Sequence, residues 1–128
     1  MVNDILTEKI INCAYKVYNT LGSGFLESVY QNALLIELEN NNLETKPEVE
    51  LAVEYENKTV GNFRADLIVE NKVILELKAC ECLQKIHEVQ LVNYLKATNI
   101  EIGLLFNFGP TGLNFKRKYK EYKKSCKS

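Results

Sequence analysis

Apolar residues recur every three or four positions in three stretches of the chain, a spacing that predicts amphipathic helices. We expect these helices at residues 4–20, 26–41 and 84–98. A Gly-Ser-Gly segment at 22–24 separates the first two, and three asparagines at 40–42 end the second. The residues expected to face the core from the second helix are Leu26, Val29, Tyr30, Ala33, Leu34 and Leu38.

Shorter stretches alternate apolar and polar residues, a pattern that predicts strands. Residues 50–56, 60–69 and 73–79 alternate in this way, and 100–108 is a nearly continuous apolar run typical of a buried strand. A last short edge strand is expected around 113–119. The resulting order, α-α-β-β-β-α-β-(β), predicts a mixed α/β domain in which helices pack against one sheet.

The polar turn at 70–72 decides how the second and third strands pair. A three-residue turn pairs Val69 with Val73 and keeps the apolar residues of both strands on one face. That face is expected to hold Phe63, Ala65, Leu67, Val69, Val73, Leu75 and Leu77. The same register sets Asp66 opposite Glu76, with their Cβ atoms about 5 Å apart. Like charges directly opposite destabilise a sheet, so a compensating divalent cation is expected.

Composition supports a single globular domain. The chain has 128 residues, of which 46% are hydrophobic and 26% charged. No apolar run approaches the about 20 residues needed to span a membrane, and no signal peptide is recognised. The four cysteines show no CxxC spacing, which favours a reduced, cytoplasmic setting.

Charge is unevenly distributed although the net charge is only −1. Residues 116–127 hold seven Lys or Arg against one acid, and the rest of the chain holds nine basic and sixteen acidic residues. We therefore expect a domain at 1–119 and a Lys-rich tail at 120–128. The basic segment, which begins with Lys116, Arg117 and Lys118, is either a phosphate-binding arm or a solvated terminus.

Asp66, Glu76 and Lys78 form the first candidate for chemistry. Hydrolysis of a phosphodiester needs a hard cation to hold the phosphate and activate water, and Mg²⁺ takes one or two carboxylates in such sites. Lys78 follows Glu76 on the same face and would orient the attacking water. The alternative is an exposed polar face, with Asp66 paired to Arg64 or Lys78.

Two of the predicted helices carry further candidates. Glu27 and Tyr30 share one helix face, and Glu27 is explained either by the helix dipole or as a third carboxylate for the cation. His87, Gln90 and Tyr94 form a polar stripe, which is either the wet side of its helix or part of the same site. His87 is the single histidine and is either structural or a general base.

Together these stretches resemble the GxxExxY proteins, a prokaryote-centred group in the PD-(D/E)XK nuclease superfamily. The resemblance covers about residues 5–119, and five motifs occur in the family's order. The motifs are Gly24-Phe25-Leu26-Glu27-Ser28-Val29-Tyr30, Phe63-Arg64-Ala65-Asp66-Leu67, Glu76-Leu77-Lys78-Ala79, His87-Glu88-x-Gln90-Leu91-x-x-Tyr94-Leu95-Lys96 and Gly103-Leu104-Leu105-x-Asn107-Phe108-Gly109.

The resemblance implies a restriction-endonuclease-like core, a central mixed sheet flanked by helices, with Mg²⁺ or Mn²⁺ as cofactor. It implies that Asp66, Glu76 and the backbone carbonyl of Leu77 bind the metal, and that Lys78 is the catalytic lysine. Glu27 is similar to the acid on the first core helix of the superfamily. The supporting residues that it implies are Gln90 and Tyr94.

The leading hypothesis is therefore metal-dependent hydrolysis of nucleic acid, with DNA favoured over RNA. Arg64 is expected either to grip phosphate or to pair with Glu27. A homodimer is expected if both strands of a duplex are cut. The alternatives are a non-catalytic nucleic-acid-binding or protein-interaction module on the same fold, and a small subunit of a larger complex.

Overall fold

The computed structural model describes residues 4–120, so residues 121–128 of the expected tail lie outside the described part. The predicted order of helices and strands is confirmed, including the last strand. The helices are α1 (Asp4–Leu21), α2 (Glu27–Asn40) and α3 (Lys85–Lys96). The strands are β1 (Thr45–Tyr55), β2 (Lys58–Val69), β3 (Val73–Lys78), β4 (Ile102–Phe108) and β5 (Leu113–Tyr119).

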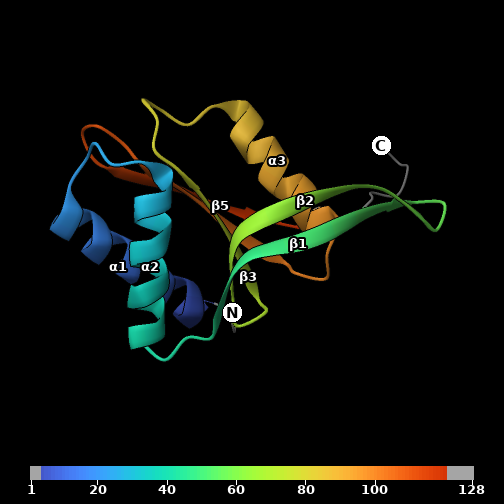
Figure 1. Cartoon of the computed structure of the whole chain (residues 1–128), viewed down its shortest axis with the longest axis horizontal. Coiled ribbons are helices and arrows are strands. Elements are labelled where there is room, and N and C mark those ends of the chain that lie inside the picture. Colours follow the sequence, from blue (N-terminus) through green and yellow to red (C-terminus); the bar gives the residue numbers. More distant parts are fainter. Residues whose placement is uncertain (1–3, 121–128) are drawn as a thin grey trace.

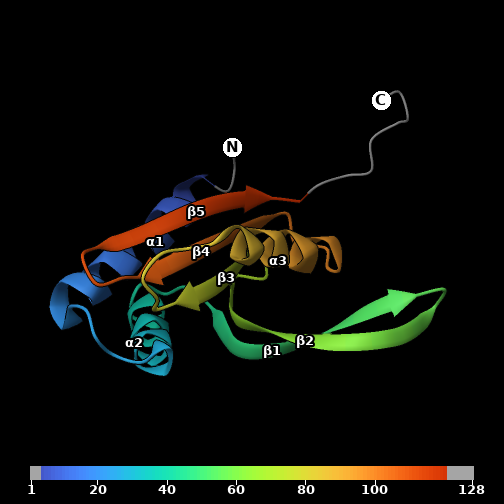
Figure 2. The same cartoon turned by 90° about the horizontal axis from the view of Figure 1, so that it is seen from above.

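The five strands form one mixed sheet in the order β1-β2-β3-β4-β5. Only β3 and β4 are parallel, and α3 makes the crossover between them. The α1–α2 pair lies to one side of the sheet and α3 to the other (Figures 1 and 2). This is the predicted mixed α/β architecture, and it is consistent with a restriction-endonuclease-like fold. Within residues 4–120, no helix is long and apolar enough to cross a membrane.

Each face of the sheet buries its own apolar cluster. The larger cluster joins α1 and α2 to the sheet and includes Leu34 and Leu75, whereas the smaller one joins α3 to it through Leu91 and Leu95. The prediction that Leu26 faces the core was wrong, because its side chain is 76% exposed. Leu26 is the N-cap residue of α2, with an extended backbone, so the helical spacing does not yet apply to it.

The turn between β2 and β3 has the predicted length. Val69 pairs with Val73, and the N–H of Lys72 donates to the Val69 carbonyl at 2.9 Å. Glu70 and Asn71 both have positive φ, at 55° and 54°, as the central residues of a type I′ turn require. The predicted hairpin register is therefore confirmed.

The predicted single apolar face is broken at Asp66. Ala65 packs in the smaller cluster towards α3, as does the ring of Phe63, whereas Leu67 packs in the larger cluster. Across the β1–β2 ladder, Glu48 lies between the residues paired with Ala65 and Leu67, and its φ is +50°. This local distortion bends the ladder and ends the simple alternation of faces.

The distal half of the β1–β2 hairpin extends beyond the helices as an arm (Figures 1 and 2). Val53, Tyr55 and Val60 are exposed along it. Its tip is a two-residue turn in which Glu56 and Asn57 have φ of 54° and 66°. The arm therefore contributes little to the core.

Replacing Gly103 with Ala is expected to destabilise the fold by about 1–3 kcal/mol. A Cβ at Gly103 would lie 2.7 Å from Cδ1 and 2.9 Å from Cγ of the fully buried Leu91, so the Leu91 side chain would have to shift within the packed core. Gly61→Ala is the matched control, because a Cβ there meets no atom within 4 Å. Urea unfolding of both variants measures the difference, and equal stabilities would contradict the close contact between α3 and β4.

Candidate active site

The β2–β3 ladder opens into a fork at two carboxylates. The last regular pair is Leu67 with Leu75. Beyond it, the N–H of Asp66 donates to Oε2 of Glu76 at 3.1 Å, and the N–H of Leu77 donates to Oδ2 of Asp66 at 2.8 Å. The predicted meeting of Asp66 and Glu76 is therefore confirmed, and their side chains take the place of ladder hydrogen bonds.

Both carboxyls of this fork are held in surroundings that disfavour their negative charge. Glu76 is only 8% exposed. Its burial, with a further contribution from the Asp66 charge, raises the pKa of the Glu76 carboxyl to about 8. Burial also raises the pKa of Asp66, although the hydrogen bond from Leu77 and the charge of Lys78 oppose the rise. The protonated, neutral carboxyls are therefore favoured in the absence of a cation, and a cation bound between them would favour their ionised forms.

Lys78 and Glu27 both act on the fork through their charges. Lys78 is half-buried at the end of β3, and its charge lowers the pKa of Asp66 and of Glu76. Glu27 is the first residue of α2, and its charge raises the pKa of both. Of the four residues with predicted catalytic roles, Asp66 and Glu76 meet at the fork. Lys78 and Glu27 lie near enough for their charges to act on it.

Tyr94 reaches the fork from α3. Its ring stacks on that of Phe63, with centroids 4.0 Å apart. Burial raises the pKa of the Tyr94 hydroxyl, and the charges of Glu76 and Asp66 raise it further. Tyr94 therefore lies near the fork, on the face of the sheet that packs against α3.

Comparison with known proteins identifies the superfamily. A sequence model of the PD-(D/E)XK nuclease superfamily matches residues 4–121, nearly the whole chain. The chain belongs to the PD-(D/E)XK nuclease superfamily. No curated protein matches the chain.

Among solved structures, the crystal structure of SSO0001 is similar, with a TM-score of 0.60 and 24% sequence identity. The alignment covers 76% of this chain but only 52% of that chain, so this PD-(D/E)XK domain spans about half the length of its structural neighbour. At this level of identity the likeness shows a shared fold.

Glu27 is not placed as a direct third ligand of a PD-(D/E)XK metal site. Within residues 4–120, no three His, Cys, Asp or Glu side chains lie close enough together to hold one metal ion. Glu27 is exposed at the start of α2 and influences the fork by its charge rather than by contact. The pair Asp66 and Glu76 therefore remains the candidate ligand set.

Two of the predicted supporting residues, Tyr30 and His87, make structural contacts. Tyr30 is fully buried, and its hydroxyl donates to the Gly22 carbonyl at 2.6 Å, which fixes the loop that leads to Glu27. Nδ1 of His87 accepts the N–H of Gln84 at 3.0 Å in a capping box, so the structural interpretation of His87 is favoured. Arg64 is exposed opposite Glu50 and makes no ion pair within residues 4–120.

The remaining predicted residues lie on α3 and β5. Gln90 is exposed on α3. Lys116 and Arg117 are exposed on β5, and Nζ of Lys118 forms an ion pair with Glu88 at 2.7 Å.

Glu48 is a neighbour of the PD-(D/E)XK site that the sequence did not reveal. Its charge raises the pKa of Asp66, and its Oε2 accepts a hydrogen bond from Nε2 of Gln31 at 3.4 Å. The predicted first strand began at residue 50, whereas β1 begins at Thr45. The Lys46-Pro47-Glu48 segment breaks the alternation, and that break was the available signal.

Asn107 is a second residue that sequence reasoning left without a role. Its side chain is completely buried and clamps the backbone of Cys80 from both sides. Nδ2 donates to the Cys80 carbonyl at 3.0 Å, and Oδ1 accepts the Cys80 N–H at 2.9 Å. The clamp fixes the path of the chain directly after Lys78.

Asn107→Ala is expected to destabilise the protein by about 2–6 kcal/mol, because it leaves the two backbone groups of Cys80 unpaired at about 1–3 kcal/mol each. The matched control is Asn114→Ala, since Asn114 is the exposed partner of Asn107 on β5. Thermal or urea unfolding compares the two variants. Similar losses in both would show that the clamp contributes no more than a surface amide.

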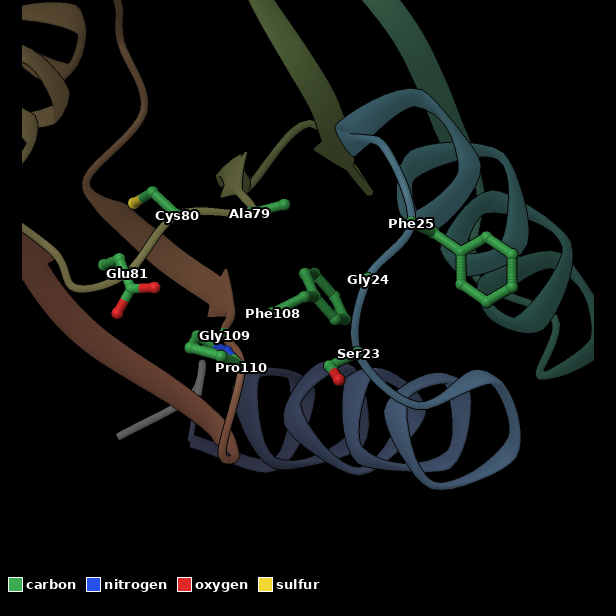
Figure 3. A pocket seen from close by; sticks show the side chains of 9 residues that line it. All are labelled: Ser23, Gly24, Phe25, Ala79, Cys80, Glu81, Phe108, Gly109 and Pro110. Atoms are coloured by element: carbon green, nitrogen blue, oxygen red, sulfur yellow. The ribbon is translucent and has the colours of Figure 1, made fainter.

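An open pocket of about 380 Å³ lies beyond the carboxyl end of β3. It is lined by three short segments, 23–25, 79–81 and 108–110. Figure 3 shows the ring of Phe108 between Ala79 and Gly24, whereas Phe25 turns away from the pocket. The first lining segment ends two residues before Glu27 and the second begins directly after Lys78, so the pocket adjoins the candidate PD-(D/E)XK site.

Proposed function

We propose that this protein is a metal-dependent nuclease that hydrolyses phosphodiester bonds in nucleic acid, with DNA favoured over RNA. The observation that carries the proposal is the fork, where Asp66 and Glu76 meet under the charge of Lys78. Within the superfamily we assign the chain to the GxxExxY group, on its Gly24–Tyr30 motif. We also propose a cytoplasmic location and, for cutting both strands of a duplex, a homodimer.

The donor set of the fork fits Mg²⁺ or Mn²⁺. One oxygen of each carboxylate accepts a backbone N–H, and no bond within residues 4–120 engages the other oxygen of Asp66 or Glu76. Two carboxylates, with water and substrate phosphate, are a common ligand set for Mg²⁺. We propose the carbonyl of Leu77 as a further ligand. Such a cation lowers the pKa of a bound water and neutralises charge on the phosphate.

The residues of the chain then have separate tasks. The two backbone hydrogen bonds hold Asp66 and Glu76 in fixed orientations, so they need little rearrangement to bind a cation. Lys78 orients the attacking water and stabilises negative charge that develops on the phosphate. The charge of Glu27 increases the attraction of the site for a cation, and Tyr94 limits access of water from the α3 side.

A non-catalytic nucleic-acid-binding module on the same fold is the second candidate. The observation that favours it is that, among the described residues, no third acidic side chain joins the pair. A degenerate nuclease fold of this kind would bind substrate without cutting it.

A cleavage assay separates the two candidates. Single- and double-stranded DNA and RNA are incubated with Mg²⁺ or Mn²⁺, and a parallel reaction contains EDTA. We expect cleavage that EDTA abolishes and that an identically purified Asp66→Asn variant lacks. Binding of nucleic acid without cleavage in any metal would favour the non-catalytic module.

A further inference from the structure

A second charged surface lies on the far side of α3 from the fork. A groove of about 170 Å³ runs between α3 and β5. Its lining contains three lysines, Lys85, Lys96 and Lys118, and a single acid, Glu88. The groove is therefore electropositive, in contrast to the acidic fork.

The charges around Glu88 show how strongly positive this groove is. Nζ of Lys118 lies 2.7 Å from Oε1 of Glu88, and the two side chains are 27% and 17% exposed. The hydrogen bond from Lys118 lowers the pKa of Glu88, and the charges of Lys118, Lys116 and Lys85 lower it further. Several cations thus converge on one carboxylate.

Most of this positive charge is not neutralised. Lys85, Lys96 and Lys116 are exposed and form no ion pair within residues 4–120. The three lining lysines and the neighbouring Lys116 are set against one acid, so this region keeps a surplus of about three positive charges. Exposed ammonium groups in such a row are well suited to phosphates that follow one another along a backbone.

The position of the groove decides which ligand it suits. Strand β5 lies two strands away from β3, about 10 Å at the usual strand spacing. Helix α3, about 10 Å wide, lies between the groove and the fork. Tyr94, which lies near the fork, is on the side of α3 that faces away from the groove. A ligand that touches both places must cross α3, so a single nucleotide is too short.

We propose that the groove lined by Lys85, Lys96 and Lys118, together with the neighbouring Lys116, binds the sugar–phosphate backbone of nucleic acid away from the bond being cleaved. The proposal rests on the proposed function of the fork. Glu88 holds Lys118 in place and competes with phosphate for it. The groove then anchors a polymeric substrate so that another part of the same molecule reaches the fork.

The test is a binding measurement on the triple variant Lys85→Gln/Lys96→Gln/Lys116→Gln. Fluorescence anisotropy with a 20-base-pair DNA duplex and with the matching single strand, in EDTA, follows binding between 50 and 200 mM salt. We expect the affinity to fall at least tenfold and the slope of log K against log salt to decrease by about 2–3, since each phosphate contact contributes about 0.9. We also expect Glu88→Gln to bind several-fold more tightly.

The matched control is Lys9→Gln/Lys46→Gln/Lys58→Gln, which removes three exposed lysines from α1, β1 and the start of β2. Equal affinity and salt slope in both triple variants, in a protein that still cleaves nucleic acid, would overturn the groove proposal and leave the nuclease proposal standing. A wild-type protein that neither binds nor cleaves any nucleic acid would overturn both.

Sedimentation of the two triple variants provides a further readout. If only the groove variant dissociates from a dimer to a monomer, and its affinity for nucleic acid is unchanged, the groove is an interface between copies of the chain and the proposal is wrong. An unchanged sedimentation coefficient together with weakened binding is the expected result.

Discussion

Replacing Lys78 with Ala is expected to slow metal-dependent cleavage at least about 100-fold while leaving metal binding intact. Lys78 acts on the fork through its charge and is not one of the carboxylates that would hold the cation. Asp66→Asn is expected to lose both cleavage and metal binding, because it removes a proposed ligand of the metal. The two variants therefore separate the binding of the metal from the chemistry.

Single-turnover cleavage rates measure the chemistry. The shift of the unfolding temperature with added Mg²⁺ or Mn²⁺ measures metal binding. Lys72→Ala is the control for Lys78, since Lys72 is an exposed lysine in the turn of the same hairpin. Wild-type cleavage by Lys78→Ala would contradict the assigned role. Retention of the metal-induced shift by Asp66→Asn would show that the metal binds elsewhere.

The metal-free protein is expected to lose stability as pH rises from about 4.5 to about 8. Glu76 has an ordinary pKa of 4.5 when unfolded and about 8 when folded. Below this pH range Glu76 is protonated in both the folded and the unfolded state, so its ionisation does not reduce the stability. Within it the unfolded state releases the proton first, and ionisation therefore favours unfolding. Each pKa unit corresponds to about 1.4 kcal/mol, so the total effect amounts to a few kcal/mol.

Urea unfolding in EDTA at several pH values measures this slope. Glu76→Gln is expected to flatten most of it and to raise stability at pH 8, whereas the exposed Glu39→Gln leaves it unchanged. Saturating Mg²⁺, at about 100 times its dissociation constant, adds about 2.7 kcal/mol. An unaltered slope in Glu76→Gln would mean that Glu76 is not the group that titrates.

Local periodicity was sufficient to predict the helices, the strands and the β2–β3 register. The three-residue turn that pairs Val69 with Val73 lies within one short segment, so the meeting of Asp66 and Glu76 followed from it. The switch of faces at Asp66 could not be predicted from the pattern of β2, because it depends on Glu48 in the neighbouring strand. The distortion at Glu48 lies in β1, and the alternation of apolar and polar residues in β2 gives no sign of it.

Side-chain direction was the less predictable part of the site. Glu27 and Tyr30 are three residues apart, yet the ring of Tyr30 stacks on Phe108 in the core while Glu27 is exposed. Helical spacing places the two residues on neighbouring positions of α2 but does not determine how α2 is rotated about its axis relative to the sheet. The Asn107 clamp on Cys80 joins residues 27 positions apart, and only the parallel pairing of β3 and β4 brings them together.

The arm formed by the distal half of β1 and β2 makes the protein convenient to label. Its two-residue tip, Glu56 and Asn57, lies at the end of the arm, away from the helices (Figure 2). Exposed turns of this kind tolerate insertions and attached groups with little effect on the rest of a domain. A dye or surface linker coupled at this position would leave both the fork and the groove between α3 and β5 uncovered. Single molecules tethered there are therefore expected to keep both surfaces accessible.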